Sequence, residues 1–225
     1  MNRIKLVDEI VDLEWMAFGE VQNEGGRAGC QDNRETFYIM RRSQYLVWTE
    51  EMLLRYKADF ETALSRGWNM VTEKYARMME SNAREQYEAI KDELPPVSPA
   101  RKALTDLVAA IQVKWMEEFA ARYPNLANKG RAIHSAEDSE YNTSFETYLK
   151  GELLTYSPEM LLLYTAFVLD LKKKGKNLSE LTMRFMTALY GYASLEIAET
   201  KQKYSRAARE IAQQYLSGIG WKKLE

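Results

Sequence analysis

The chain has 225 residues, of which 46% are hydrophobic and 28% charged, a composition typical of a globular protein rather than a disordered one. A formal charge of −2 gives no global attraction for nucleic acid, and no run approaches the roughly 20 apolar residues that span a bilayer. The single cysteine, Cys30, excludes an internal disulfide and favours a reducing compartment, so we expect a cytoplasmic protein.

Helical signals dominate the chain, and no stretch shows the alternation of a strand. An apolar stripe with one carboxylate in it, Glu14, predicts the first helix. Capping residues before apolar runs, such as Thr49, predict the later helix starts, and glycines such as Gly67 predict the ends. The expected helices cover about residues 4–21, 50–66, 70–81, 99–122, 158–174 and 195–216, and one more begins after Asn177.

Two segments of the chain resemble each other. Residues 37–70 align without gaps onto residues 145–178, with ten identities where chance would supply about two or three. The identical pairs are Phe37/Phe145, Leu46/Leu154, Glu51/Glu159, Met52/Met160, Leu53/Leu161, Leu54/Leu162, Tyr56/Tyr164, Ala58/Ala166, Gly67/Gly175 and Asn69/Asn177. The alternative is a coincidence of helical periodicity, which inflates matches between unrelated helices.

This self-similarity predicts an all-α fold of two pseudo-symmetric multi-helix units. The units cover about residues 1–92 and 98–191, and a long C-terminal helix follows over about residues 194–217. We expect the units to pack as one helical domain over residues 1–225, with a cleft between them.

Each unit has a polar connection after its first helix, over residues 23–33 and 128–138. Polar loops of this length are often functional. Aligning Gly26-Arg27 with Gly130-Arg131 places Cys30 opposite His134. This pairing raises the hypothesis of a thiol activated by imidazole, with Asp32 or Asp138 orienting the ring. The alternative is an ordinary small thiol and a loop histidine with structural hydrogen bonds.

Three further polar positions are candidates for a ligand site. Arg42 aligns with Lys150 and Gln44 with Glu152, so a cation and a polar group recur in both units. A cation kept within an apolar segment can hold a carboxylate or phosphate, and the alternative is a solvated face or a salt bridge to Glu14 or Glu35. Lys74 lies in a charged, methionine-rich segment that could line the site or simply form a buried helix face.

Several function classes find no support in the sequence. With one histidine the chain cannot form the paired Glu-x-x-His motifs of a di-iron bundle, so no metal site is expected. No phosphate-binding loop, dinucleotide fingerprint or nucleophile elbow occurs, and no cofactor is predicted. The lysines and arginines of the last helix are diluted by glutamates, which favours a solvated face over nucleic-acid contact.

Several segments resemble a bacterial family known as domain of unknown function 4125. The segments that carry the resemblance are residues 23–27, 30–32, 39–44, 72–80 and 143–153, and it extends over about residues 1–200. The resemblance implies a prokaryotic source and a stand-alone helical domain. It implies no activity and no catalytic residues.

Two functional hypotheses follow. In the first, the cleft between the units binds or transforms a small polar or anionic metabolite, with Cys30 and His134 as the candidate catalytic residues. The residues expected to line this cleft are Arg27, Asp32, Arg42, Gln44, Lys74 and Arg131. In the second, the chain is a non-enzymatic interaction or regulatory module. There Tyr45, Trp68, Trp221 and the last helix contact another protein or a second copy, forming a homodimer.

Overall fold

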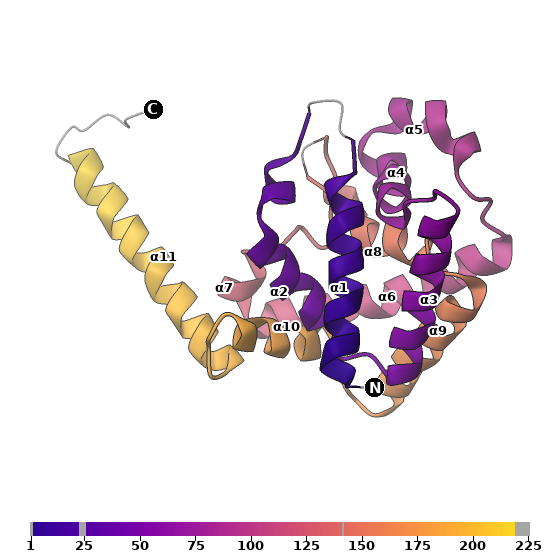
Figure 1. Ribbon diagram of the computed structural model, residues 1–225. Coiled ribbons are helices and arrows are strands. Elements are labelled where there is room, and N and C mark those ends of the chain that lie inside the picture. The colour runs from indigo at the N-terminus through magenta and orange to yellow at the C-terminus, as the bar shows by residue number, and fades with distance from the viewer. Residues whose placement is uncertain (1, 23–25, 141, 219–225) are drawn as a thin grey trace.

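The computed structural model describes residues 2–22, 26–140 and 142–218, and within the last helix it describes only the backbone of residue 209 and residues 212–218. Residues 23–25 of the first loop and Trp221 lie outside the described residues. In this part of the chain all regular structure is helical, with eleven α-helices and an isolated bridge between Ser139 and Asn142. The predicted all-α class is therefore confirmed (Figure 1).

The helices follow one another along the chain in two halves of similar order. The first half contains α1 (Arg3–Gly19), η1 (Gly29–Asp32), α2 (Arg34–Tyr45), α3 (Glu50–Ser65), α4 (Met70–Asn82), α5 (Arg84–Ile90) and η2 (Lys91–Glu93). The second half contains α6 (Pro99–Arg122), α7 (Pro124–Ala127), η3 (Ser135–Glu137), α8 (Phe145–Leu153), α9 (Pro158–Lys173), α10 (Leu178–Leu189) and α11 (Leu195–Gly218). The elements labelled η are short 3-10 helices.

The helix boundaries agree with the capping signals. The side chain of Thr49 accepts a hydrogen bond from the backbone N–H of Met52, and Ser98 caps α6 in the same way. Such caps satisfy N–H groups that have no partner within the helix. Gly67 and Gly175 have φ values of 73° and 64°, the left-handed conformation that lets the chain leave a helix without a steric penalty.

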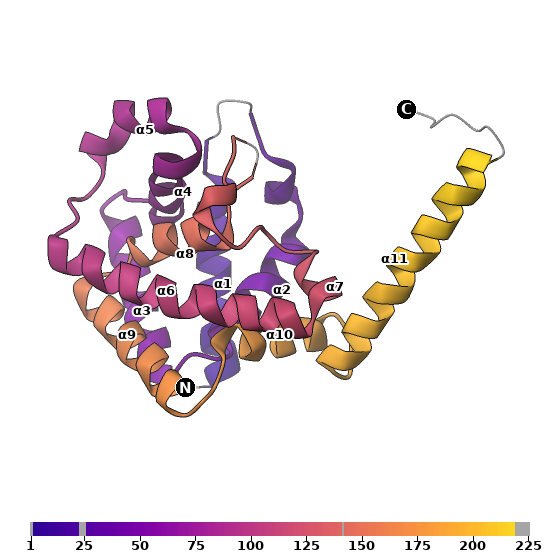
Figure 2. The same cartoon turned by 180° about the vertical axis from the view of Figure 1, so that it is seen from behind.

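The helices of the two halves pack against each other. Helix α1 lies on α2, α3 and α4, and α6 lies on α8, α9 and α10. Across the halves, α4 packs on α8, α2 on α10 and α3 on α9 (Figures 1 and 2). One hydrophobic cluster runs from Leu6 in α1 to Leu178 in α10, so residues of both halves share a core. None of the described helices is long and apolar enough to cross a membrane.

Aromatic rings fill the centre of this core. The Trp48 ring meets Tyr45, Tyr56, Tyr156 and Tyr164 at centroid distances of 4.8 to 6.1 Å, all in edge-on arrangements. Edge-to-face geometry is favourable because the positive ring edge meets the negative ring face. Three of these tyrosines belong to a polar network that is described below.

Helix α11 has a base that packs on the body and a long free part. Leu195 and Ala198 are buried against Phe119 and Leu126, and the carboxylate of Glu199 accepts hydrogen bonds from backbone N–H groups of α7. Beyond this base the helix extends away from the body with no other helix beside it (Figures 1 and 2). The described side chains of this part are exposed or half-buried.

The crossing of α4 and α8 depends on Gly151. A Cβ atom at this position would lie 2.8 Å from Cγ of Met78 and 3.0 Å from the carbonyl oxygen of Lys74, closer than normal contacts. We expect Gly151→Ala to lower the free energy of unfolding by about 1–3 kcal/mol, despite the better helix propensity of alanine, because the two helices must separate. Urea denaturation measures this change.

Gly19 provides the matched control. It is also helical, and a Cβ atom there would meet nothing within 4 Å. Gly19→Ala should therefore leave stability unchanged or raise it by up to about 1 kcal/mol. Equal stability of the two alanine variants would contradict the close contact between α4 and α8.

Candidate functional site

Four charged side chains meet in the interior where α1, α2, α4 and α8 come together. They are Glu14, Arg41, Lys74 and Glu152, each at most 7% exposed, and we call them the buried charge cluster. Arg41 lies at its centre. Its Nε and Nη2 bind the two carboxylate oxygens of Glu14 at 2.7 and 2.6 Å, and its Nη1 binds Glu152 at 2.9 Å. This two-pronged geometry suits guanidinium and carboxylate groups.

Tyrosine hydroxyl groups complete the hydrogen bonding of the two carboxylates. Tyr45 and Tyr56 donate to Glu14 at 2.6 and 2.8 Å, and Tyr156 donates to Glu152 at 3.2 Å. Burial raises the pKa values of all three tyrosines well above the ordinary range. These hydroxyl groups therefore act as hydrogen-bond donors and not as bases at neutral pH.

Lys74 balances the charge of the cluster. Its Nζ lies 3.5 Å from Glu152 and donates to the hydroxyl of Tyr148 at 2.8 Å. Burial alone would lower the pKa of Lys74, but Tyr148 and Glu152 raise it above its usual value. Burial alone would likewise raise the pKa of Glu152, whereas Arg41 and Lys74 lower it to about 2. Two cations thus face two anions, and the lysine is held protonated rather than as a free amine.

The two polar loops approach the surface end of this network. The guanidinium of Arg131 lies 4.7 Å from the ring centre of Tyr148, and Lys74 reaches the same ring from the interior. Burial raises the pKa of Tyr75 to about 12, with opposing influences from Lys74 and Arg131 and a further rise from Cys30. Both loops lie at one end of the body (Figures 1 and 2), and Cys30 of the first loop and Arg131 of the second both influence the pKa of Tyr75. We call Cys30, Tyr75, Arg131 and Tyr148 the loop face.

The other predicted ligand residues have partners within the chain. Arg27 pairs with Asp32 at 2.8 Å and also donates to two backbone carbonyl groups. Arg42 pairs with Asp8 at 2.8 Å and is 29% exposed, so it faces outward while Arg41 faces inward. Gln44 accepts a hydrogen bond from Arg41 at 2.5 Å. Of the predicted ligand residues, Lys74 thus belongs to the buried charge cluster and Gln44 is hydrogen-bonded to it. Arg131 is connected to the cluster through Tyr148. The Arg27–Asp32 pair and Arg42 do not bind it.

No hydrogen bond joins Cys30 to His134 among the described residues. Cys30 is exposed near Tyr75. His134 is also exposed, and its Nε2 lies 3.2 Å from a carboxylate oxygen of Glu117 on α6. Nowhere in the described ranges do three His, Cys, Asp or Glu side chains gather as metal ligands would.

Two residues of the interaction hypothesis have partners within the fold. Tyr45 is completely buried, and its predicted role in a surface contact is therefore wrong. Its ring packs beside Trp48, and its hydroxyl is used by Glu14. Trp68 is half-buried, and its indole N–H donates to Glu73 at 2.6 Å. Glu73 also pairs with Arg77, four residues later on the same helix, at 2.6 Å.

The sequence patterns did not identify Arg41 and Glu152 as members of the buried charge cluster, nor Tyr148 as the ring beside Lys74. A signal for it was present, because Glu14 interrupts an otherwise apolar stripe, which requires a buried partner. A second signal was the pair of adjacent arginines, which point about 100° apart on a helix. Neither signal says which arginine faces inward.

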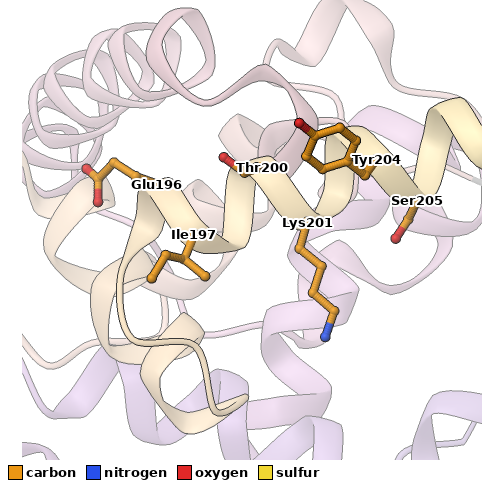
Figure 3. A pocket seen from close by; sticks show the side chains of 6 residues that line it. All are labelled: Glu196, Ile197, Thr200, Lys201, Tyr204 and Ser205. Atoms are coloured by element: carbon orange, nitrogen blue, oxygen red, sulfur yellow. The ribbon is translucent and has the colours of Figure 1, made fainter.

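A hollow of about 490 Å³ lies on α11, away from both loops. Its lining is made by one helix alone (Figure 3). The lining residues are Glu196, Ile197, Thr200, Lys201, Tyr204 and Ser205. This hollow is open and exposed, whereas the predicted metabolite site was expected between the two units.

No curated protein and no solved structure matches the chain. One family model does match, over residues 4–200, which includes the buried charge cluster, both loops and the base of α11. The match ends near the point where α11 leaves the body. The chain belongs to the family described as Protein of unknown function (DUF4125).

Proposed function

We propose that this chain is a non-enzymatic helical interaction module whose C-terminal helix is the contacting arm. The observation that carries the proposal is a row of three exposed apolar side chains on the side of α11 that faces away from the body, beginning at its base. Ile197, Tyr204 and Ile211 are 52%, 69% and 66% exposed. Large apolar side chains in a row, with no helix packed on them, are typical of a surface that binds another protein.

The charges of the body favour a structural role over chemistry. The buried charge cluster has two acids and two bases in mutual contact, so no ligand charge is needed to balance it. The pKa of Lys74 is raised and that of Glu152 is lowered, which is the opposite of what a lysine nucleophile or a carboxylic general acid requires. The cytoplasmic location expected from the single cysteine is part of this proposal.

Cross-linking in the producing cells tests the arm. A lysine-reactive cross-linker should join the exposed Lys201 and Lys203 of α11 to other polypeptides, whether these are second copies or different proteins. Lys172 and Lys173 at the end of α9 are exposed on the body and serve as controls. An equal yield of intermolecular cross-links from both lysine pairs would refute the arm as the contact surface.

The loop face supports a second candidate, the binding of a small anionic metabolite. Arg131 is exposed over the ring of Tyr148, and the first loop lies near the same position through Cys30. A guanidinium on an aromatic ring is a frequent recognition site for carboxylates and phosphates. The line of residues from Arg131 through Tyr148 to Lys74 would then connect the ligand with the buried charge cluster.

A thermal-shift screen with phosphate, nucleotides and carboxylic acids tests this candidate. A ligand at about 100 times its dissociation constant adds roughly 3 kcal/mol of stability. Arg131→Ala should remove the shift, whereas Lys129→Ala, an exposed cation of the same loop, should retain it. No shift with any anion, or an equal shift in both variants, would exclude the loop face.

We also infer that the chain arose by internal duplication within a single helical domain. The order α1, α2, α3, α4 of the first unit parallels α6, α8, α9, α10 of the second. Arg3 donates to the carbonyl group of Trp48, and Arg101 donates to that of Tyr156, the aligned residue. The shared core supports one domain. A family member whose halves do not align in this register would argue against the duplication.

A further inference from the structure

We infer that α11 binds α11 of a second copy of this chain, forming a parallel two-helix coiled coil. The inference rests on the proposed function, because it names the partner of the same arm. It follows from four features of the described part of α11: the spacing of its apolar residues, the shape of its surface, the side that faces the body and the charges beside the stripe.

The apolar residues recur every seven positions. Ile197, Tyr204 and Ile211 occupy one position of a heptad, called a, and all three are exposed. The d positions between them, Thr200 and Ala207, carry small side chains. A seven-residue apolar repeat keeps one seam of a helix against a partner helix, and small d residues let two backbones approach closely.

Four of the residues that line the hollow on α11 occupy the heptad positions of a coiled-coil hole. In a parallel pair, a d side chain of one helix enters a hole formed by residues a, d, e and the next a of the other. Ile197, Thr200, Lys201 and Tyr204 are four such residues, and they line the hollow (Figure 3). Thr200 of the second copy would enter it. The other lining residues, at positions g and b, form its rim.

The apolar stripe faces away from the body. Leu195 and Ala198 are buried against it, and Glu199 and Gln202 are partly covered. At about 100° per residue the centre of this covered side lies roughly 150° around the helix from Ile197, and the nearest of the four side chains, Ala198, lies about 100° from it. Two arms could therefore join along their stripes with both bodies on the outer sides, so the bodies do not obstruct a parallel pair.

The charges beside the stripe favour the parallel orientation. There, Glu196 at position g, whose carboxylate also accepts a hydrogen bond from Tyr123 of the body, faces Lys201 at position e of the second copy, an attractive pair formed twice in the dimer. Lys203 faces Ala208, which is neutral. In an antiparallel pair g faces g, which would bring Lys203 near Lys203 and Glu196 near Glu210. These like-charge contacts disfavour the antiparallel arrangement.

Sedimentation velocity on the full chain tests self-association. Between about 5 and 500 µM we expect the mass to rise from 26.2 kDa toward twice that value, because three apolar layers give only a weak pair. Ile197→Asn combined with Tyr204→Asn should raise the dissociation constant at least about tenfold. Arg206→Ala, an exposed site outside the seam, should change it less than about threefold.

Charge exchange tests the orientation. Glu196→Lys alone should weaken the dimer, and Glu196→Lys with Lys201→Glu should restore it, because the pair is re-formed with opposite signs. A failure of the double exchange to restore the dimer would overturn the parallel arrangement.

A monomer at all concentrations would overturn the dimer. If Lys201 still cross-links to a different protein, the contacting arm stands and only its partner is wrong. If it cross-links to none, both proposals fail.

Discussion

Replacing Arg41 with alanine is expected to lower the free energy of unfolding by about 3–5 kcal/mol. The substitution leaves Glu14 and Glu152 buried, and among the described residues of the cluster Lys74, beside Glu152, is then the one remaining cation. An uncompensated carboxylate in a low-dielectric interior must stay charged at a high cost or take up a proton.

Arg42→Ala is the matched control, because the two arginines are neighbours on one helix and differ in the side they face. Arg42 pairs with Asp8 at the surface, where both side chains are partly exposed. Such pairs contribute at most about 1 kcal/mol. Urea denaturation of the two variants, monitored through the tryptophans, gives the comparison. Similar losses in both variants would contradict the central position of Arg41.

Acidification should destabilise the chain through Glu152. Its pKa is about 2 in the folded chain and 4.5 for the free side chain. Below 4.5 the unfolded chain takes up a proton that the folded chain does not, so stability falls as the pH decreases toward 2. The full loss over this window is roughly 3 kcal/mol, and about 2 kcal/mol of it should be gone by about pH 3.

Denaturation curves at several pH values between about 5 and 3 measure this effect. Glu152→Gln should have a shallower dependence on pH than the wild type, although it begins from a lower stability. Glu159→Gln, at an exposed carboxylate of α9, should keep the wild-type dependence. Should Glu152→Gln not fold, the carboxyl signal of Glu152 can be titrated by NMR in the wild type. A midpoint near 4.5 would exclude the proposed environment.

The buried charge cluster has a structural meaning that goes beyond its stability. A buried ion pair often gains little net free energy, because desolvation offsets the attraction. It does raise the free energy of arrangements in which the four side chains fail to meet, because every such arrangement leaves a buried charge unpaired. We therefore expect the cluster to set how α1, α2, α4 and α8 lie relative to one another. The crossing at Gly151 acts on the same two helices, α4 and α8.

Local signals in the sequence were sufficient to predict the helices. Thr49 and Ser98 cap helices where the sequence places them, and Gly67 and Gly175 end helices as predicted. These features depend on hydrogen bonds and backbone conformations within a few residues, so a short segment determines them by itself. The all-α class followed directly from these segments.

Only the tertiary structure decided which side chains meet. Arg41 and Glu152 are 111 residues apart in sequence, and no local rule selects Arg41 rather than Arg42 to face inward. That choice depends on which face of α2 the other helices cover. Tyr45 is buried by the surrounding helices, so it does not form the predicted surface contact. The hydrophobic packing of α11 on the body ends at Ala198, which leaves the apolar stripe of α11 uncovered. The helices result from short-range bonding, whereas the candidate sites result from long-range packing.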